Sequence, residues 1–202
     1  MESSQRVIET AASYLDVVPF NDTALIQQCI NEITEPEEGE TEPKILEGPE
    51  VVVFGRVVRQ PRDVGFFSNV SSGYRYSGKC MEARKLTGGL HQLLDKVNSH
   101  FGSHFDGILV NRYVDGSKYI CAHSDDEAGC DKACGVVALS YGATRKFRIR
   151  EKATKKKVQD VLLVSGELVH MGGEFQREFT HEIPKEMRVK EVRYSFTFRT
   201  HL

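Results

Sequence analysis

The chain has 202 residues, of which 40% are hydrophobic and 28% are charged, and its formal net charge is −2 at pH 7. These values suit one globular domain and exclude both a pair of ordinary domains and a segment that spans a bilayer. The first 18 residues lack the basic start and the uninterrupted apolar core of a signal peptide, so we expect an intracellular protein with no membrane partner. The five cysteines are odd in number and irregularly spaced, which indicates reduced thiols rather than a disulfide framework.

Two segments carry apolar residues at the three- and four-residue spacing of amphipathic helices. The first, FNDTALIQQCINEIT at 20–34, opens with residue types that cap helices, and the second, LTGGLHQLLDKVNSHF, lies at 86–101. Residues 35–44 contain two prolines and no apolar side chain, so we expect an acidic loop there. Between loop and second helix, 49–60 predicts two short strands that turn near Gly55, and 73–78 predicts another.

Beyond the second helix the chain is strand-like throughout, because short runs of β-branched and aromatic residues alternate with turn residues. The predicted strands lie within 105–113, 118–123, 134–141, 145–150, 158–164, 179–183 and 192–199. Helices followed by a run of short strands predict an α+β chain whose second half is an antiparallel sandwich or barrel.

A cluster of charge, HSDDE at 123–127, interrupts this strand pattern. If His123 and Asp125 lie on one strand, both side chains point to the same face, and His181 sits on another predicted strand. Two imidazoles and one carboxylate on one face of a metal form the triad of non-haem Fe(II) proteins that activate dioxygen. A histidine two residues from an acid also occurs on ordinary surface strands, so the motif needs support from elsewhere in the chain.

That support comes from RYSFTFR at 193–199, where Arg193, Ser195, Thr197 and Arg199 share one face of a predicted strand. An unpaired buried guanidinium costs several kcal/mol or more, so two inward arginines require an anion. A dicarboxylate held by guanidinium groups beside iron is what a 2-oxoglutarate dioxygenase requires.

The order N-x-Y at 111–113, H-x-D at 123–125, His181 and R-x-S-x-T-x-R at 193–199 resembles the AlkB family of Fe(II)/2-oxoglutarate-dependent nucleic-acid demethylases. The similarity extends upstream through VVVFGRVVRQPR and YRYSG, and so covers about residues 50–202. It implies a single dioxygenase domain, 1–202, with a double-stranded β-helix (jelly-roll) core at 105–202. A nucleotide-recognition region with β-hairpins would occupy 50–104, and an N-terminal helix and acidic loop would occupy 1–49.

The resemblance also implies a role for individual residues. It assigns iron to His123, Asp125 and His181. It assigns 2-oxoglutarate to Asn111, Tyr113, Arg193, Thr197 and Arg199, with Arg199 on the distal carboxylate. It assigns the methylated base to Tyr74, Tyr76, Ser77, Asp126 and Glu127, where Asp126 faces the exocyclic amine. Ser195 stands where many family members have Asn, which alters the detailed geometry of a supporting contact.

The implied reaction is oxidative N-demethylation of 1-methyladenine or 3-methylcytosine in DNA or RNA by a monomer that uses Fe(II), O2 and 2-oxoglutarate and releases formaldehyde. Phe54 aligns with a hairpin position where relatives that act on duplexes insert an apolar wedge, although a Phe after three valines also suits a core. Residues 145–157 carry eight basic groups and one acid. Together with Lys185, Arg188 and Lys190 they either grip phosphates or form a solvated hairpin.

Three alternatives remain open at this point. The same iron core could act on a protein, a lipid or a small molecule. Cys121, His123, Cys130 and Cys134 have residue types that bind structural zinc, although zinc would not explain the C-terminal arginines. An inactive nucleic-acid reader is disfavoured because the iron ligands and both arginines are present. The sequence leaves open DNA against RNA, single against double strand, and nucleus against cytoplasm.

Overall fold

The computed structural model describes residues 4–36, 44–53, 55–76, 79–126, 130–131 and 134–201, and for 53, 74–76, 79, 130 and 131 it describes the backbone alone. Phe54, Ser77 and Glu127 therefore lie outside the described residues, and Tyr74 and Tyr76 are placed by their backbone only.

The larger of two main sheets is antiparallel, and its central strand, β16, is hydrogen-bonded to β11 on one side and to β8 on the other. A two-residue strand, β10 (Cys130–Asp131), pairs with the end of β16. In spatial order the strands are β1 (Gln5–Glu9), β2 (Ser13–Pro19), β14 (Glu167–Gly173), β11 (Val136–Gly142), β16 (Arg193–His201), β8 (Gly107–Tyr113) and β5 (Asp63–Ser68).

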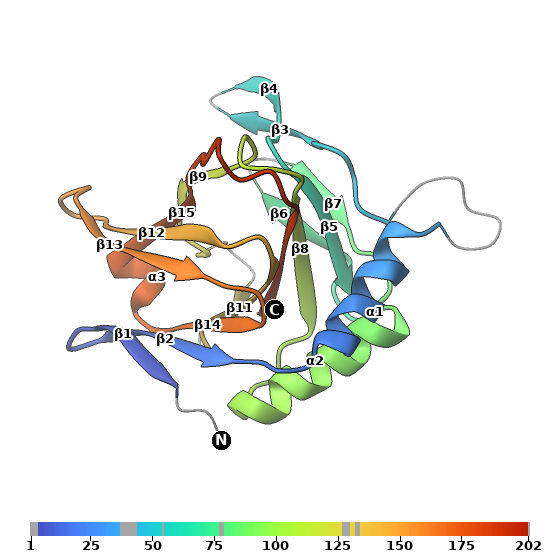
Figure 1. Cartoon of the computed structure of the whole chain (residues 1–202), viewed down its shortest axis with the longest axis horizontal. Coiled ribbons are helices and arrows are strands. Elements are labelled where there is room, and N and C mark those ends of the chain that lie inside the picture. The colour runs from blue at the N-terminus through green and yellow to red at the C-terminus, as the bar shows by residue number, and fades with distance from the viewer. Residues whose placement is uncertain are drawn as a thin grey trace.

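The smaller sheet lies across from it and is also antiparallel, in the order β13 (Lys157–Leu163), β12 (Arg145–Glu151), β15 (Phe179–Ile183) and β9 (Ile120–His123). Two hairpins stand apart from these sheets, as Figure 1 shows. They consist of β3 (Glu50–Val53) with β4 (Arg56–Arg59), and of β6 (Gly73–Tyr76) with β7 (Lys79–Glu82). A single turn of helix, α3 (Phe175–Glu178), leads from β14 into β15.

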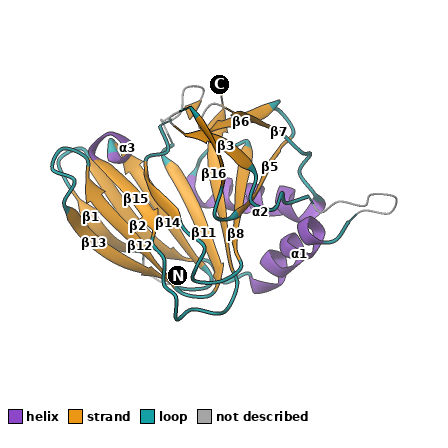
Figure 2. Cartoon of the chain, turned by 90° about the horizontal axis from the view of Figure 1, so that it is seen from above, coloured by secondary structure: helices purple, strands orange, loops and turns teal. Residues whose placement is uncertain are grey.

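Two amphipathic helices cover the outer face of the larger sheet (Figure 2). The first, α1 (Thr23–Thr34), is capped at its N-terminus by Asp22, whose side chain accepts a hydrogen bond from the Leu25 amide at 3.2 Å. The second, α2 (Gly88–Phe101), ends at Gly102, whose φ of 59° is in the left-handed region that favours glycine. Their apolar faces and the sheet form one core.

A second core fills the space between the two sheets, with Val136 and Val169 from the larger sheet facing Phe147 and Val161 from the smaller one. Strand β16 contributes to both sides of the larger sheet. Tyr194, Phe196 and Phe198 enter the helix-side core, and the polar residues between them line a cavity between the sheets. The predicted division of this strand into an apolar face and a polar face is confirmed.

The helices at 20–34 and 86–101 and every predicted strand are found, so the α+β class is confirmed. The expectation for the N-terminus was incomplete, because a hairpin of two strands precedes α1 and extends the larger sheet through β14. Strands β5, β7, β10 and β14 were not predicted either. None of the helices within the described ranges is long and apolar enough to cross a membrane.

Candidate active site

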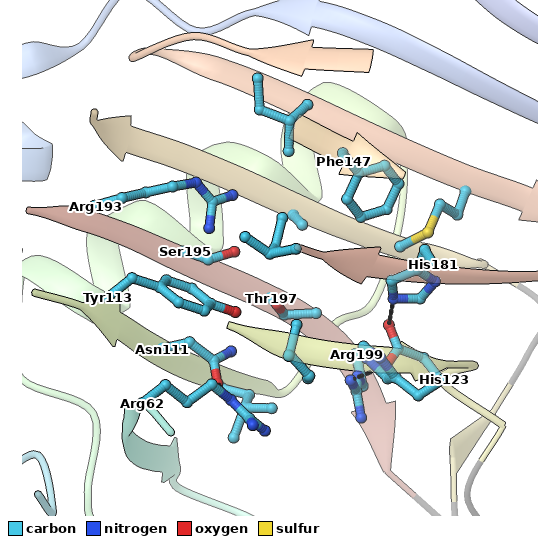
Figure 3. Close-up of a pocket in the computed structure, with 17 residues that line it drawn as sticks. Arg62, Asn111, Tyr113, His123, Phe147, His181, Arg193, Ser195, Thr197 and Arg199 are labelled. Carbon is cyan, nitrogen blue, oxygen red and sulfur yellow. Dashed lines mark hydrogen bonds and ion pairs between the residues drawn. The ribbon is translucent and has the colours of Figure 1, made fainter. Parts of the chain in front are cut away.

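A cavity between the two sheets holds about 540 Å³ of space that no atom fills, including the solvent at its mouth. Strands of both sheets supply its walls, and residues far apart in the sequence meet there (Figure 3). The polar lining residues are Arg62, Asn111, Tyr113, His123, Asp125, His181, Arg193, Ser195, Thr197 and Arg199.

One end of the cavity gathers three groups that bind metals. The ligand atoms of His123, Asp125 and His181 all lie within 4.8 Å of one another. The Asp125 carboxylate lies 3.6 Å from His123 Nε2 and 3.5 Å from His181 Nε2. The Cys121 carbonyl oxygen, 2.9 Å from His123 Nδ1, can only accept, so Nδ1 carries the proton and Nε2 presents its lone pair. This donor set fits Fe(II).

Asp125 lies just beyond the strand that carries His123, because β9 ends at His123, so the condition of one shared strand is not met. It reaches the cluster through a bend that two hydrogen bonds hold in place. The Ser124 hydroxyl donates to the Phe179 carbonyl at 2.8 Å, and the Asp125 amide donates to Gln176 Oε1 at 2.9 Å. The bend, rather than the alternation of side chains along a strand, therefore brings the Asp125 carboxylate next to the two histidines.

Burial and nearby charges keep His123 and Asp125 in the states that metals bind. Burial, reinforced by the neighbouring His181, lowers the pKa of His123 to about 3, so its imidazole is neutral at physiological pH. Burial raises the pKa of the Asp125 carboxyl, but the Arg199 guanidinium and a hydrogen bond with His181 outweigh it and hold that pKa below its usual range. Neutral imidazole and ionised carboxylate are the forms that coordinate a cation.

The other end of the cavity is built to take an anion. Arg193 is 1% exposed, and its Nη2 donates to Ser140 Oγ at 2.8 Å. Among the described residues, its Nε and Nη1 have no hydrogen-bond partner. Burial and the nearby positive charge of Arg145 lower the pKa of Arg193 to about 10. A buried guanidinium with two unused donors fits an anion such as a carboxylate, which accepts charge-assisted hydrogen bonds.

The two arginines of β16 occupy opposite ends of the cavity, as Figure 3 shows. Arg199 lies at the metal end, where its Nη2 donates to Asp125 Oδ1 at 2.5 Å. Arg193 lies at the far end, where its guanidinium stands 5.4 Å from the centre of the Tyr113 ring. Arg199 was predicted to bind the distal carboxylate of 2-oxoglutarate, and in the structure it lies next to Asp125, with Arg193 at the opposite end of the cavity.

Sequence reasoning missed one charged residue of the cavity, Arg62, which is 5% exposed. Its Nε donates to Asn111 Oδ1 at 2.7 Å and so orients an amide that was predicted to contact 2-oxoglutarate. Arg62 lies in a loop just before β5 and reaches Asn111 across 49 positions of sequence. No local pattern marks a contact of this kind.

The predicted base-binding residues are not brought together by any contact between described side chains. Asp126 follows Asp125 but is not among the residues that line the cavity, and its side chain is 46% exposed. It is paired with Lys152, 3.0 Å away. The backbone of Tyr74 and Tyr76 lies in β6. Among side chains that the structure describes, the one group suited to a metal contains no cysteine, which gives the zinc alternative no support.

Many of the basic groups in 145–157 have acidic partners within the fold. Arg148 holds Asp160 through two bonds of 2.8 and 2.9 Å, and Arg150 holds Glu182 at 2.9 Å. Three exposed cations in the loop between β15 and β16 differ, because no ion pair joins them to an acid within the described part of the chain. We refer to these three, Lys185, Arg188 and Lys190, as the loop cations.

Residues 19–199 match the family model described as the 2OG-Fe(II) oxygenase superfamily. The chain belongs to this superfamily. The cofactors of the superfamily are Fe(II) and 2-oxoglutarate, and both ends of the cavity of this oxygenase fit them.

Curated relatives confirm the resemblance to AlkB proteins. The oxygenase is 30% identical over 156 residues to the mouse DNA oxidative demethylase ALKBH2, covering 74% of this chain and 65% of the relative. It is 30% identical over 151 residues to the human alpha-ketoglutarate-dependent dioxygenase alkB homolog 3, covering 70% of this chain and 52% of the relative. The chain thus spans less than two thirds of the length of these relatives.

A solved structure agrees at the level of the fold. The structure of OsALKBH1 matches with a TM-score of 0.59 over 98% of this chain and 100% of that chain, at 16% sequence identity. This likeness supports the arrangement of antiparallel sheets and few helices.

Proposed function

We propose that this oxygenase removes methyl groups oxidatively from ring nitrogens of alkylated bases in DNA or RNA and releases them as formaldehyde. The observation that carries the proposal is a single cavity with a His-Asp-His cluster at one end and an unsatisfied buried guanidinium at the other. The relatives named as a DNA oxidative demethylase and a dioxygenase support the substrate class and the reaction.

In this proposal His123, Asp125 and His181 hold Fe(II). When bound, Fe(II) and 2-oxoglutarate supply the activation of dioxygen, with release of succinate and carbon dioxide. The chain itself keeps the His123 imidazole neutral, fixes the Asp125 carboxylate through Arg199, and shields the site by placing it between two sheets.

The 2-oxoglutarate site would use Arg193 for the distal carboxylate, because its Nε and Nη1 are the unused donors. Arg199, next to Asp125, would serve the end of the co-substrate nearest the metal. Asn111, Tyr113 and Thr197 line the wall between these two positions, which suits a short dicarboxylate chain.

The methylated base would bind outside the metal end. We propose that Asp126 accepts a hydrogen bond from its exocyclic amine, supported by Glu127, and that Tyr74, Tyr76 and Ser77 form the pocket. Substrates such as 1-methyladenine are cationic, which favours an acidic and aromatic pocket. Phe54 would act as a wedge if the substrate is a duplex.

Both hairpins fall in 50–104, the proposed nucleotide-recognition region. The four-stranded parts of the two main sheets that lie within 105–202 face each other and would form a double-stranded β-helix.

A second candidate is oxidation of a protein or a small molecule by the same site. The pairing of Arg148 and Arg150 with acids favours this candidate, because these two cations are then not available for phosphates. The loop cations remain as the phosphate contacts of the first candidate.

One assay separates the two candidates. The protein is incubated in air with Fe(II), 2-oxoglutarate and an oligonucleotide that carries 1-methyladenine or 3-methylcytosine, as DNA and as RNA. We expect a mass loss of one methylene per methylated base, formaldehyde in equal amount, and no reaction by the Asp125→Ala variant. Succinate formation without any mass loss would contradict the demethylase proposal and leave the oxygenase one.

A further inference from the structure

Three successive residues after β9 are each anchored to the segment that runs from α3 into β15. Ser124 donates to the Phe179 carbonyl, and the Asp125 amide donates to the side chain of Gln176. Asp126 is anchored indirectly, through Lys152. The candidate metal ligand and the candidate base contact are thus tied to one short piece of chain.

Lys152 makes the third of these links. Its Nζ donates to Asp126 Oδ2 at 3.0 Å and to the Gln176 carbonyl at 2.7 Å, and its own amide donates to the Glu178 carbonyl at 2.8 Å. The lysine side chain is 28% exposed, so its position is set by two acceptors rather than by packing alone.

Gln176 gives this link a fixed base. Its side chain is buried, and its Nε2 lies 3.6 Å from Met171 Sδ, which leaves Oε1 facing the Asp125 amide. The same residue therefore holds the backbone of the metal ligand with its side chain and holds Lys152 with its carbonyl oxygen.

We propose that Lys152 is a positioning residue that fixes the Asp126 carboxylate against Gln176 and thereby determines which methylated base the site accepts. This inference rests on the proposed function. Without Lys152, the Asp126 side chain, which is 46% exposed, loses the ion pair that holds it beside Gln176.

The selectivity follows from the chemistry of a carboxylate. An ionised carboxylate only accepts hydrogen bonds, so it favours a base with an exocyclic amine and disfavours one with a carbonyl at that position. Adenine and cytosine present the amine, and guanine presents the carbonyl. When this carboxylate is fixed relative to the metal ligand, its hydrogen bond favours reaction only of a base whose methyl group then points at the metal.

The test compares four variants on single-stranded oligonucleotides that carry 1-methyladenine or 1-methylguanine. They are Lys152→Met, Lys152→Arg, Asp126→Asn and the double variant Lys152→Met with Asp126→Asn. Lys157→Met is the matched control, because Lys157 is on the same hairpin and pairs with Asp160 at 3.6 Å. The readouts are kcat and KM for each base, and binding of each oligonucleotide without oxygen, with Fe(II) and 2-oxoglutarate present.

We expect Lys152→Met to lower the preference for 1-methyladenine about tenfold, the usual effect of removing one charge-assisted hydrogen bond. Succinate formed in the absence of an oligonucleotide, and the 2-oxoglutarate requirement, should stay within about twofold of the wild-type protein, because Lys152 touches neither co-substrate. Lys152→Arg should restore most of the preference, Lys157→Met should keep it, and Lys152→Met should add nothing to Asp126→Asn.

Equal loss of activity on both bases, a similar loss in Lys157→Met, or an added loss in the double variant would overturn the inference, since each indicates general attraction of phosphates. If the wild-type protein demethylates 1-methyladenine and Lys152→Met keeps its preference, only the role of Lys152 fails. If the wild-type protein demethylates neither base in any oligonucleotide but still forms succinate, the proposed function fails and this role fails with it.

Discussion

Replacing Arg193 with methionine should stabilise the protein when no ligand is present and abolish its use of 2-oxoglutarate. Arg193 is 1% exposed, and burial lowers its pKa from 12.5 to about 10. At about 1.4 kcal/mol for each pKa unit, this change corresponds to a cost of about 3 kcal/mol for keeping the charged form in the fold. The variant also loses the hydrogen bond to Ser140, which destabilises it by about 1 kcal/mol. The free energy of unfolding should therefore rise by about 2 kcal/mol in total.

The cost of burying the charged Arg193 side chain depends on pH only at the alkaline end of the scale. Because the pKa of a base is lowered by folding, the cost is complete below about pH 10 and fades only as the pH rises towards 12.5. The difference between Arg193→Met and the wild-type protein should therefore be the same at every pH from about 6 to 9.

Urea unfolding measured with and without 2-oxoglutarate tests both the expected stability of Arg193→Met and its expected loss of 2-oxoglutarate binding. At a ligand concentration about 100 times its dissociation constant, the wild-type protein should gain about 2.7 kcal/mol and Arg193→Met should gain nothing. A variant that is less stable than the ligand-free wild type, or that is still stabilised by 2-oxoglutarate, would show that the Arg193 guanidinium is not the group that binds the anion.

Three further outcomes are expected. Asp125→Ala should bind no stoichiometric Fe(II) in equilibrium dialysis, and retention of one bound iron would refute the cluster as the metal site. Changing all three loop cations to Gln should reduce the slope of log affinity against log salt by about 2 to 3 in an oligonucleotide titration, whereas Arg148→Gln should leave it unchanged because Arg148 is paired with Asp160. Burial raises the pKa of Cys29 to about 12, so a thiol reagent should modify the exposed Cys121 at once and Cys29 only as the protein unfolds, and equal rates would contradict the packing of α1.

The parts of the fold that could be predicted from sequence are those whose pattern is local. The helices and β16 have a clear period, because each is apolar on one side only. Strand β5 is buried at all six positions, so it has no alternation to detect, and β14 ends in two glycines that read as a turn. The N-terminal hairpin becomes a recognisable strand pair only through its contact with β14.

The site could be predicted where its residues stand in a fixed order along the chain, as in H-x-D and R-x-S-x-T-x-R. What could not be predicted was the direction in which those motifs run through the cavity, where Arg199 lies next to Asp125 and Arg193 lies at the opposite end. Arg62 and Lys152 were missed as contributors for a related reason, because each acts on a partner at least 24 positions away.

The place of β16 in the larger sheet has a consequence for how the protein folds. This strand inserts between β8 and β11, and its two faces complete the helix-side core and the cavity. Its partners lie about 50 to 90 positions earlier in the chain, so this pairing closes long loops and is expected to be slow. Until β16 is in register neither arginine is in place, so an intermediate that lacks this strand should be unable to bind 2-oxoglutarate. The co-substrate therefore reports completion of the sheet, and its presence during refolding should trap the native state rather than accelerate the early steps.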